Sequence, residues 1–130
     1  MPSEDEIKFA SSRFKIQDAI CTCFSTAELL LPLDFRGASA HVDSVVGQLQ
    51  SDTLSGQQLV QSRTYSSSDG TQPEKIDVAI GHTGQNWTPI VTVTSTSSDL
   101  EQVIFDGEFH DALQRLLVAI TTRIKRILRE

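Results

Sequence analysis

The chain has 130 residues, the size of one domain, so we expect residues 1–130 to fold around a single core. Its net charge of −6 and its 38% of hydrophobic residues do not suggest a disordered protein. No stretch approaches the roughly 18 apolar residues of a membrane-spanning helix, and the acidic start lacks the basic and apolar regions of a secretory signal. This combination predicts a cytoplasmic protein without a membrane partner.

We expect the first helix over residues 4–25. Ser3 and Glu6 have the spacing of a capping box, in which each side chain binds the backbone N–H of the other residue. A shorter helix followed by a strand through residues 15–24 is the alternative. An offset apolar stripe runs through Ile7, Ala10 and Phe14. The main buried stripe is predicted from helical spacing, at Ile16, Ile20, Cys23, Phe24 and Ala27.

The next segment is less regular. Residues 28–35 contain Pro32, which cannot donate to a strand ladder, so this stretch is predicted to be an edge strand or an extended connector. The apolar residues between positions 42 and 49 have helical spacing and predict a short helix over residues 39–51. Gly47 within that stretch disfavours a helix by about 1 kcal/mol relative to alanine.

Three strands are predicted in the middle of the chain, over residues 57–66, 75–82 and 89–97. In the second of them, Ile76, Val78 and Ile80 fall on one face, as in a strand with one buried and one wet side. The connection between the last two strands contains two glycines and an asparagine, which predicts a hairpin.

The last helix has the clearest pattern. Asp106 is the expected N-cap, and Glu108 lies in the predicted first turn. Apolar residues then recur at i, i+3, i+4 and i+7 for about five turns. Such a helix is roughly 33 Å long, whereas a strand of eight residues is about 26 Å long. The end of its apolar stripe should therefore extend beyond the sheet and need cover from the first helix or from a second copy.

This overhang is the reason for expecting a homodimer. Together the elements predict the α+β class. The predicted fold is a two-layer sandwich in which a three- to four-stranded antiparallel meander packs against an N-terminal helix and a long C-terminal helix. The predicted interface residues lie along the last helix: Leu117, Ile120, Ile124, Ile127 and Leu128.

The hairpin connection carries the only tryptophan of the chain. Trp87, together with His82 and Asn86, is able to bind a ring by stacking and hydrogen bonding, and binding residues favour loops on a rigid scaffold. Tyr65 would line the same pocket between the sheet and the helices. A tryptophan at a strand end also often covers the rim of a core, so both interpretations stay open here.

Motifs for catalysis and for cofactor binding are absent from the sequence: there is no phosphate-binding loop, nucleophile elbow or zinc-protease motif. Asp106 and His110 would share a helix face but supply only two ligands to a metal. Cys21 and Cys23 have no further cysteine to complete a zinc site. We therefore expect no cofactor and no metal, and the balance is against enzymatic activity.

Charge is distributed unevenly along the chain. Residues 112–130 hold five basic residues and one acid, whereas the preceding 111 residues hold six basic residues and sixteen acids. Basic residues near the end of a helix complement its dipole, and no aromatic residues are interleaved with them for base stacking. An acidic body also repels nucleic acid at long range, so the sequence does not favour nucleic-acid binding.

These features favour a non-enzymatic, chaperone-like module that binds or helps to assemble a protein partner as a small acidic homodimer. The alternative is a small-molecule-binding domain or enzyme with a pocket near Trp87 and His82. The two hypotheses differ in where the functional surface lies, along the last helix or at the hairpin turn.

Overall fold

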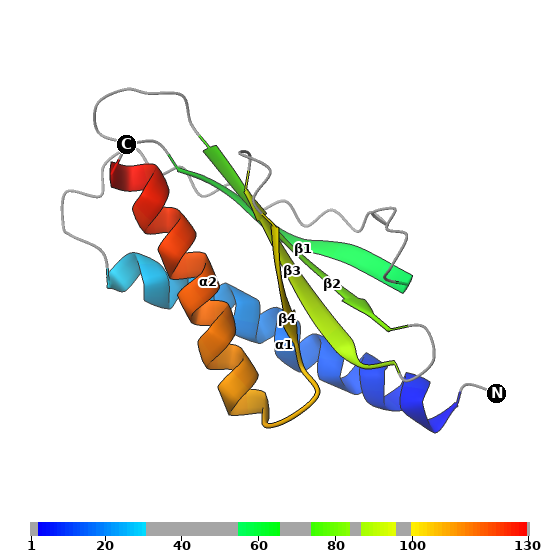
Figure 1. Cartoon of the computed structure of the whole chain (residues 1–130). Coiled ribbons are helices and arrows are strands. Elements are labelled where there is room, and N and C mark those ends of the chain that lie inside the picture. Colours follow the sequence, from blue (N-terminus) through cyan, green and yellow to red (C-terminus); the bar gives the residue numbers. More distant parts are fainter. Residues whose placement is uncertain (1–2, 31–54, 66–73, 84–86, 96–99, 130) are drawn as a thin grey trace.

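A computed structural model describes residues 3–30, 55–65, 74–83, 87–95 and 100–129. The predicted segments over residues 31–35 and 39–51 lie outside the described residues. Within the described part, two helices cover one face of a four-stranded sheet (Figure 1). In chain order the elements are α1 (Glu4–Leu29), β1 (Ser55–Tyr65), β2 (Glu74–His82), β3 (Pro89–Ser95), β4 (Leu100–Ile104) and α2 (Phe109–Arg129).

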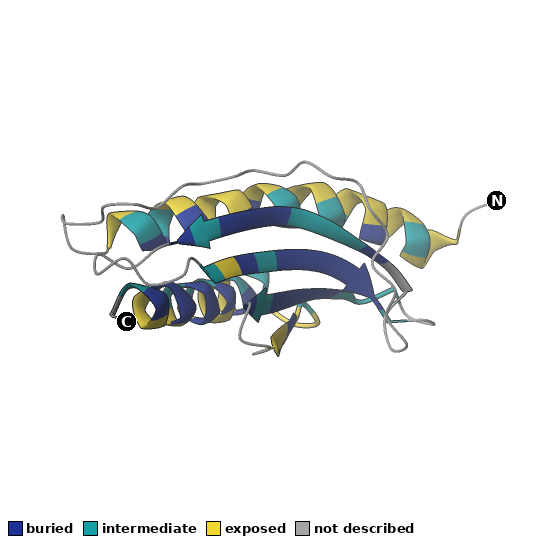
Figure 2. Cartoon of the chain, turned by 90° about the horizontal axis from the view of Figure 1, so that it is seen from above, coloured by how far each residue is buried: buried dark blue, intermediate teal, exposed yellow. Residues whose placement is uncertain are grey.

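The sheet is a meander. Its strand order is β1-β2-β3-β4, and each neighbouring pair is antiparallel. Both helices contact the same face of the sheet, α1 mainly at β1 and β2 and α2 mainly at β4 and β3, and α2 also packs against α1. Figure 2 shows buried positions, in dark blue, along both helices and along the strands. The predicted α+β sandwich is therefore confirmed: one layer is the sheet and the other is the pair of helices.

The first helix is longer than expected but begins where the sequence predicted. The Glu6 N–H donates to the Ser3 hydroxyl oxygen at 3.1 Å, so Ser3 is the N-cap. The predicted stripe from Ile16 to Ala27 is buried against the core. The alternative of a strand through residues 15–24 is wrong, because this stretch is continuous helix as far as Leu29. The offset stripe is exposed at Ile7 and Phe14.

The three predicted strands are present, with the hairpin between β2 and β3 closing at the pair of His82 and Pro89. Ile76, Val78 and Ile80 face the helices and are fully buried, as the alternation predicted. The fourth strand comes from Leu100–Ile104, which the sequence analysis did not identify. Residues 28–29, expected to start an extended segment, belong to α1 instead.

The start of α2 differs from the prediction. Asp106 and Gly107 form a bend after β4, and the Ala112 N–H donates to the Glu108 carbonyl oxygen at 3.2 Å. Glu108 therefore precedes the helix as its cap residue, and Asp106 is not the N-cap. The physical reason is β4: the chain needs the residues after Ile104 to reverse its direction before a helix can begin.

The apolar stripe of α2 is covered within the chain. Ile120 and Ile124 are fully buried, Ile127 is nearly so, and Leu117 and Leu128 are half-buried against the same cluster. That cluster also contains residues of α1 and of the sheet, and α2 packs against α1, so the stripe is buried within this chain to its end. Of the five residues predicted as a dimer interface, three thus belong to this chain's own core and two pack against it, so their apolar character gives no support to a dimer.

Neither of the two described helices combines the length and the hydropathy that a bilayer crossing requires.

Candidate interaction groove

The residues predicted to share a ligand pocket are separated in the structure. His82 and Trp87 do lie together, with their rings stacked at 4.0 Å between centroids, and Phe9 of α1 meets His82 edge-on at 4.8 Å. Tyr65 pairs with Glu74 at the opposite end of β2, eight residues or roughly 26 Å away. Asn86 lies outside the described residues. The predicted pocket containing both Tyr65 and Trp87 is therefore not formed.

His82 plays a structural part in the hairpin. It is buried, and its Nδ1 lies 2.8 Å from the Thr83 carbonyl oxygen, an arrangement in which Nδ1 donates a proton. Thr83 and Thr88 close the connection through backbone and side-chain hydrogen bonds of 3.1 and 3.2 Å. Trp87 has a φ of 53°, in the left-handed region that is uncommon for residues other than glycine. The tight closure of the hairpin holds Trp87 in that conformation against His82.

Tyr65 belongs to a polar cluster that joins β1 to the end of α1. The Glu28 carboxylate accepts hydrogen bonds of 2.7 Å from the Tyr65 hydroxyl and from the Arg63 guanidinium. Arg63 also lies over the ring of Phe24 at 4.8 Å, and its Nε donates to Gln61 at 3.1 Å. Burial, followed by the hydrogen bond to Glu28, raises the pKa of Tyr65 well above its usual range. This cluster anchors α1 on the edge strand and leaves Tyr65 inaccessible to a ligand.

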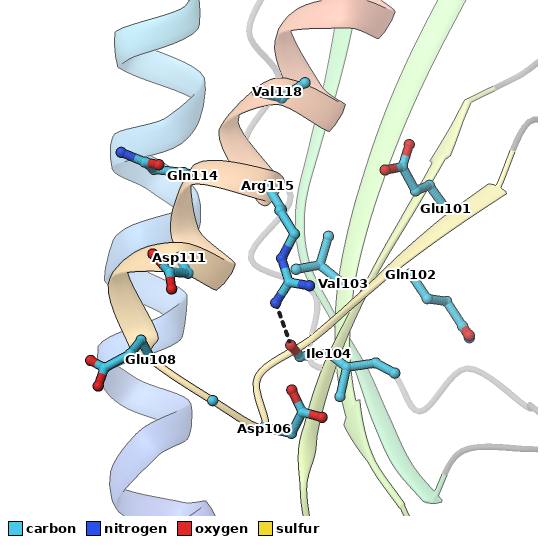
Figure 3. A pocket seen from close by; sticks show the side chains of 11 residues that line it. Glu101, Gln102, Val103, Ile104, Asp106, Glu108, Asp111, Gln114, Arg115 and Val118 are labelled. Atoms are coloured by element: carbon cyan, nitrogen blue, oxygen red, sulfur yellow. Dashed lines mark hydrogen bonds between the residues drawn. The ribbon is translucent and has the colours of Figure 1, made fainter.

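A wide hollow lies elsewhere, between β4 and α2. It has a volume of about 790 Å³ and is open to solvent. Figure 3 shows Arg115 reaching across it from α2, where a guanidinium nitrogen donates to the Ile104 carbonyl oxygen at 3.3 Å. We call this hollow the β4–α2 groove. Its walls are β4 from Glu101 to Ile104, the bend at Asp106–Glu108, and the exposed side of α2 as far as Val118.

One wall of the groove is an open strand edge. Among the described strands, β4 pairs only with β3. The Phe105 N–H donates to the Pro89 carbonyl oxygen at 2.9 Å, and hydrogen-bonded pairs alternate along an antiparallel ladder. Glu101 and Val103 therefore direct their backbone groups to β3, whereas Gln102 directs its N–H and C=O outward. The hydrogen bond from Arg115 to the Ile104 carbonyl agrees with this alternation. Ile104, like Gln102, directs its backbone groups away from β3, where a side chain of α2 is able to reach them.

Side chains on β4 alternate in the same way. Val103 points toward α2 and is buried, whereas Gln102 and Ile104 point away from the helix (Figure 3). On that outer side Leu100 is 58% exposed and Ile104 is 43% exposed. The strand thus presents two apolar side chains, separated by Gln102, next to backbone groups that face away from β3.

The groove is acidic. Its walls carry four carboxylates and one guanidinium, that of Arg115. One of the acids, Glu101, forms an ion pair of 3.0 Å with the buried Arg123 of α2, while the other three are exposed. These three stand at the β4–α2 bend and in the first turn of α2: Asp106, Glu108 and Asp111. A cationic ligand is therefore favoured over an anionic one.

Sequence reasoning missed this groove because it missed β4. The stretch Leu100–Ile104 is five residues long and mixes polar with apolar residues, so periodicity gives little signal. Asp106 and His110, considered as two metal ligands on one helix face, do not share a helix, since Asp106 lies in the bend. Across the described residues, no three His, Cys, Asp or Glu side chains form a group able to hold a metal ion.

No family model, curated protein or solved structure matches this chain.

Proposed function

We propose that this protein is a non-enzymatic interaction module that binds an extended, basic segment of a partner protein by strand addition to β4. The observation that carries the proposal is the outward-facing backbone of Gln102 in the wall of an open, acidic groove. An extended peptide that joins a sheet edge gains its affinity from main-chain hydrogen bonds and its specificity from alternate side chains. A regular strand edge beside a groove provides both.

The side-chain directions along β4 predict the order of residue types in the bound segment. Residues that pair with Leu100, Gln102 and Ile104 would place their side chains on the outer face, where two apolar neighbours are exposed. The intervening residues would point into the acidic groove beside α2. The best-fitting segment therefore alternates apolar and basic residues over about five positions, the length of β4.

Arg115 regulates access to this edge. In the unbound chain it occupies the Ile104 carbonyl, and exposed strand edges are commonly protected by a basic side chain in this way. A bound strand would compete for that carbonyl and would meet the positive charge. Arg115→Ala is therefore expected to tighten the binding of a basic segment, by about threefold to tenfold.

The proposal is tested with two synthetic peptides of identical composition, one with alternating valine and lysine and one with the same residues in blocks. The alternating peptide should bind by calorimetry, and its affinity should fall with salt. Gln102→Pro removes the outward N–H without touching the ladder to β3, so it should abolish binding while the fold persists. Gln102→Ala keeps the N–H and is the matched control. Equal binding of both peptides, or full binding by Gln102→Pro, would contradict strand addition.

A homodimer remains a prediction, now without the support of the α2 stripe. If two copies associate, β4 is the described edge that is open to a second strand, although the facing grooves would bring like charges together. Sedimentation of the wild type and of Gln102→Pro distinguishes self-association through β4 from binding of a partner segment there. Dissociation of a wild-type dimer by this substitution would mean that the edge serves self-association and not partner binding.

A further inference from the structure

A second hollow adjoins the β4–α2 groove. It has a volume of about 510 Å³ and lies between the first turns of α1, the end of the hairpin and the bend after β4. Asp106 and Gly107 line both hollows, so the two border the same bend. A segment that lies along β4 and continues past Ile104 would reach this second hollow within about one to three residues, at roughly 3.3 Å per residue. We call it the Trp87 pocket.

The Trp87 pocket combines aromatic walls with opposed charges. Trp87 and Phe105 are half-buried, and the lining also includes the buried Phe9, with 5.8 Å between its ring centroid and that of Trp87. Asp5 of α1 and Asp106 of the bend also line the pocket, and both residues are exposed. One cation, Lys8, also lines the pocket.

We infer that the Trp87 pocket binds one arginine side chain of the same partner segment, an inference that rests on the proposed strand addition. A guanidinium is planar and weakly hydrated, so it stacks on an aromatic ring and simultaneously donates to carboxylates. Two carboxylates outnumber the single ammonium, which favours a cation over an anion. A purely apolar side chain would leave the two acids without a partner and gain less.

The backbone of Trp87 strengthens this assignment. Its left-handed φ of 53° is held although the residue is not glycine, and uncommon conformations of this kind concentrate at binding sites. Stacking on His82 at an interplanar angle of 15° orients the indole ring while the residue stays partly open to solvent. The ring is thus fixed before any ligand arrives, and pre-orientation of a contact lowers the entropic cost of binding.

The first experiment isolates the pocket from the strand edge. Trp87 is the only tryptophan, so its fluorescence reports on this site alone. Titration with Nα-acetyl-arginine amide should give a saturable change, which Nα-acetyl-glutamine amide should not reproduce. Asp5→Asn and Asp106→Asn should each weaken the response about threefold, and Lys8→Ala should strengthen it about threefold. Circular dichroism of each variant confirms that the fold is retained. No saturable change with the arginine probe would overturn the inference.

The second experiment separates this inference from the proposed function. The alternating peptide is extended by Gly-Gly-Arg at either end, with Gly-Gly-Gln as the control. One of the two arginine extensions should tighten binding about fivefold, and Asp5→Asn should remove that gain. If the peptides bind and Gln102→Pro abolishes binding, but neither arginine extension helps, the arginine pocket is wrong and strand addition stands. If the arginine amide binds but no peptide does, strand addition fails and the pocket keeps only its preference for a cationic ring-stacking group.

Discussion

The two edge strands of the sheet, β1 and β4, differ in how firmly they are bound to the rest of the protein. β1 has eleven residues, two register irregularities, and side chains that bind α1, whereas β4 has five residues, a regular register and an outer face with exposed apolar side chains. Bulges and buried polar contacts make an edge a poor template for another strand. The difference teaches that β1 is joined to the body of the protein, while β4 keeps an edge that, among the described residues, pairs with no further strand and is contacted by Arg115.

The largest contrast is expected between Tyr65 and Leu100. Tyr65→Ala removes a fully buried ring from the β1 edge and should lower the free energy of unfolding by about 4 kcal/mol. Leu100→Ala removes an exposed side chain from the β4 edge and should change it by less than about 0.5 kcal/mol. Urea denaturation followed by circular dichroism measures both. A comparable loss for the two variants would mean that the β4 edge is as integrated as β1.

The ion pairs at the two edges provide a second comparison. Glu28 is 26% exposed and accepts from both Arg63 and Tyr65, whereas Glu101 is 50% exposed and pairs with Arg123 alone among the described contacts. Glu28→Ala should cost about 3 kcal/mol because it removes the acceptor of two hydrogen bonds at once, those of the buried Tyr65 hydroxyl and of the buried Arg63 guanidinium. Glu101→Ala should cost about 1 kcal/mol, since solvent screens the pair and Arg123 keeps its bond to the Ala119 carbonyl.

Thermal unfolding at low and high salt distinguishes these two ion pairs further. The Glu101 pair should weaken with added salt, and the Glu28 pair should respond little. If the Glu101–Arg123 pair did not respond to salt, it would be as well shielded from solvent as the Glu28–Arg63 pair at the β1 edge.

Amide hydrogen exchange tests directly which N–H groups of β4 bond to β3 and which point away from the sheet. The Val103 N–H should be protected by its bond to β3, whereas the Gln102 N–H should exchange almost as fast as in an unfolded chain. On addition of the alternating peptide, Gln102 should become protected and Val103 should change little. Protection of the Gln102 N–H in the isolated protein at all concentrations would show that its edge is already covered.

The smallest effect concerns the two cysteines, and it tests how tightly α1 is held against the β1 edge. Burial raises the pKa of the Cys23 thiol to about 11, so at pH 8 only roughly one molecule in a thousand carries the reactive thiolate there. Cys21 is exposed, with Gln61 of β1 beside its sulfur. Iodoacetamide should therefore modify one cysteine quickly, identified as Cys21 by mass spectrometry. Equal labelling of both would indicate that α1 detaches readily from the sheet.

Much of the fold followed from local patterns. Ser3 caps α1, and the stripes of Ile16 and Ile20 and of Ile120 and Ile124 are buried as their spacing predicted. The alternation in β2 identified the face that meets the helices. Of the candidate sites, the stacking of His82 and Trp87 agreed with the grouping of these residues, because both stand at the same hairpin end. Tyr65 was misplaced because pairing register, which a single strand does not reveal, decides which strand ends are neighbours.

The sequence by itself determined which residues are apolar on which face, and hence the two helices and three of the strands. Only the tertiary structure decided what covers those faces, since periodicity reports burial but not the identity of the burying surface. Thus the end of the α2 stripe is buried in a cluster of this chain that also contains residues of α1 and of the sheet. The fourth strand was also a tertiary outcome: five residues of mixed polarity become a strand because β3 supplies their hydrogen bonds, and the open edge that results is the feature to which we assign function.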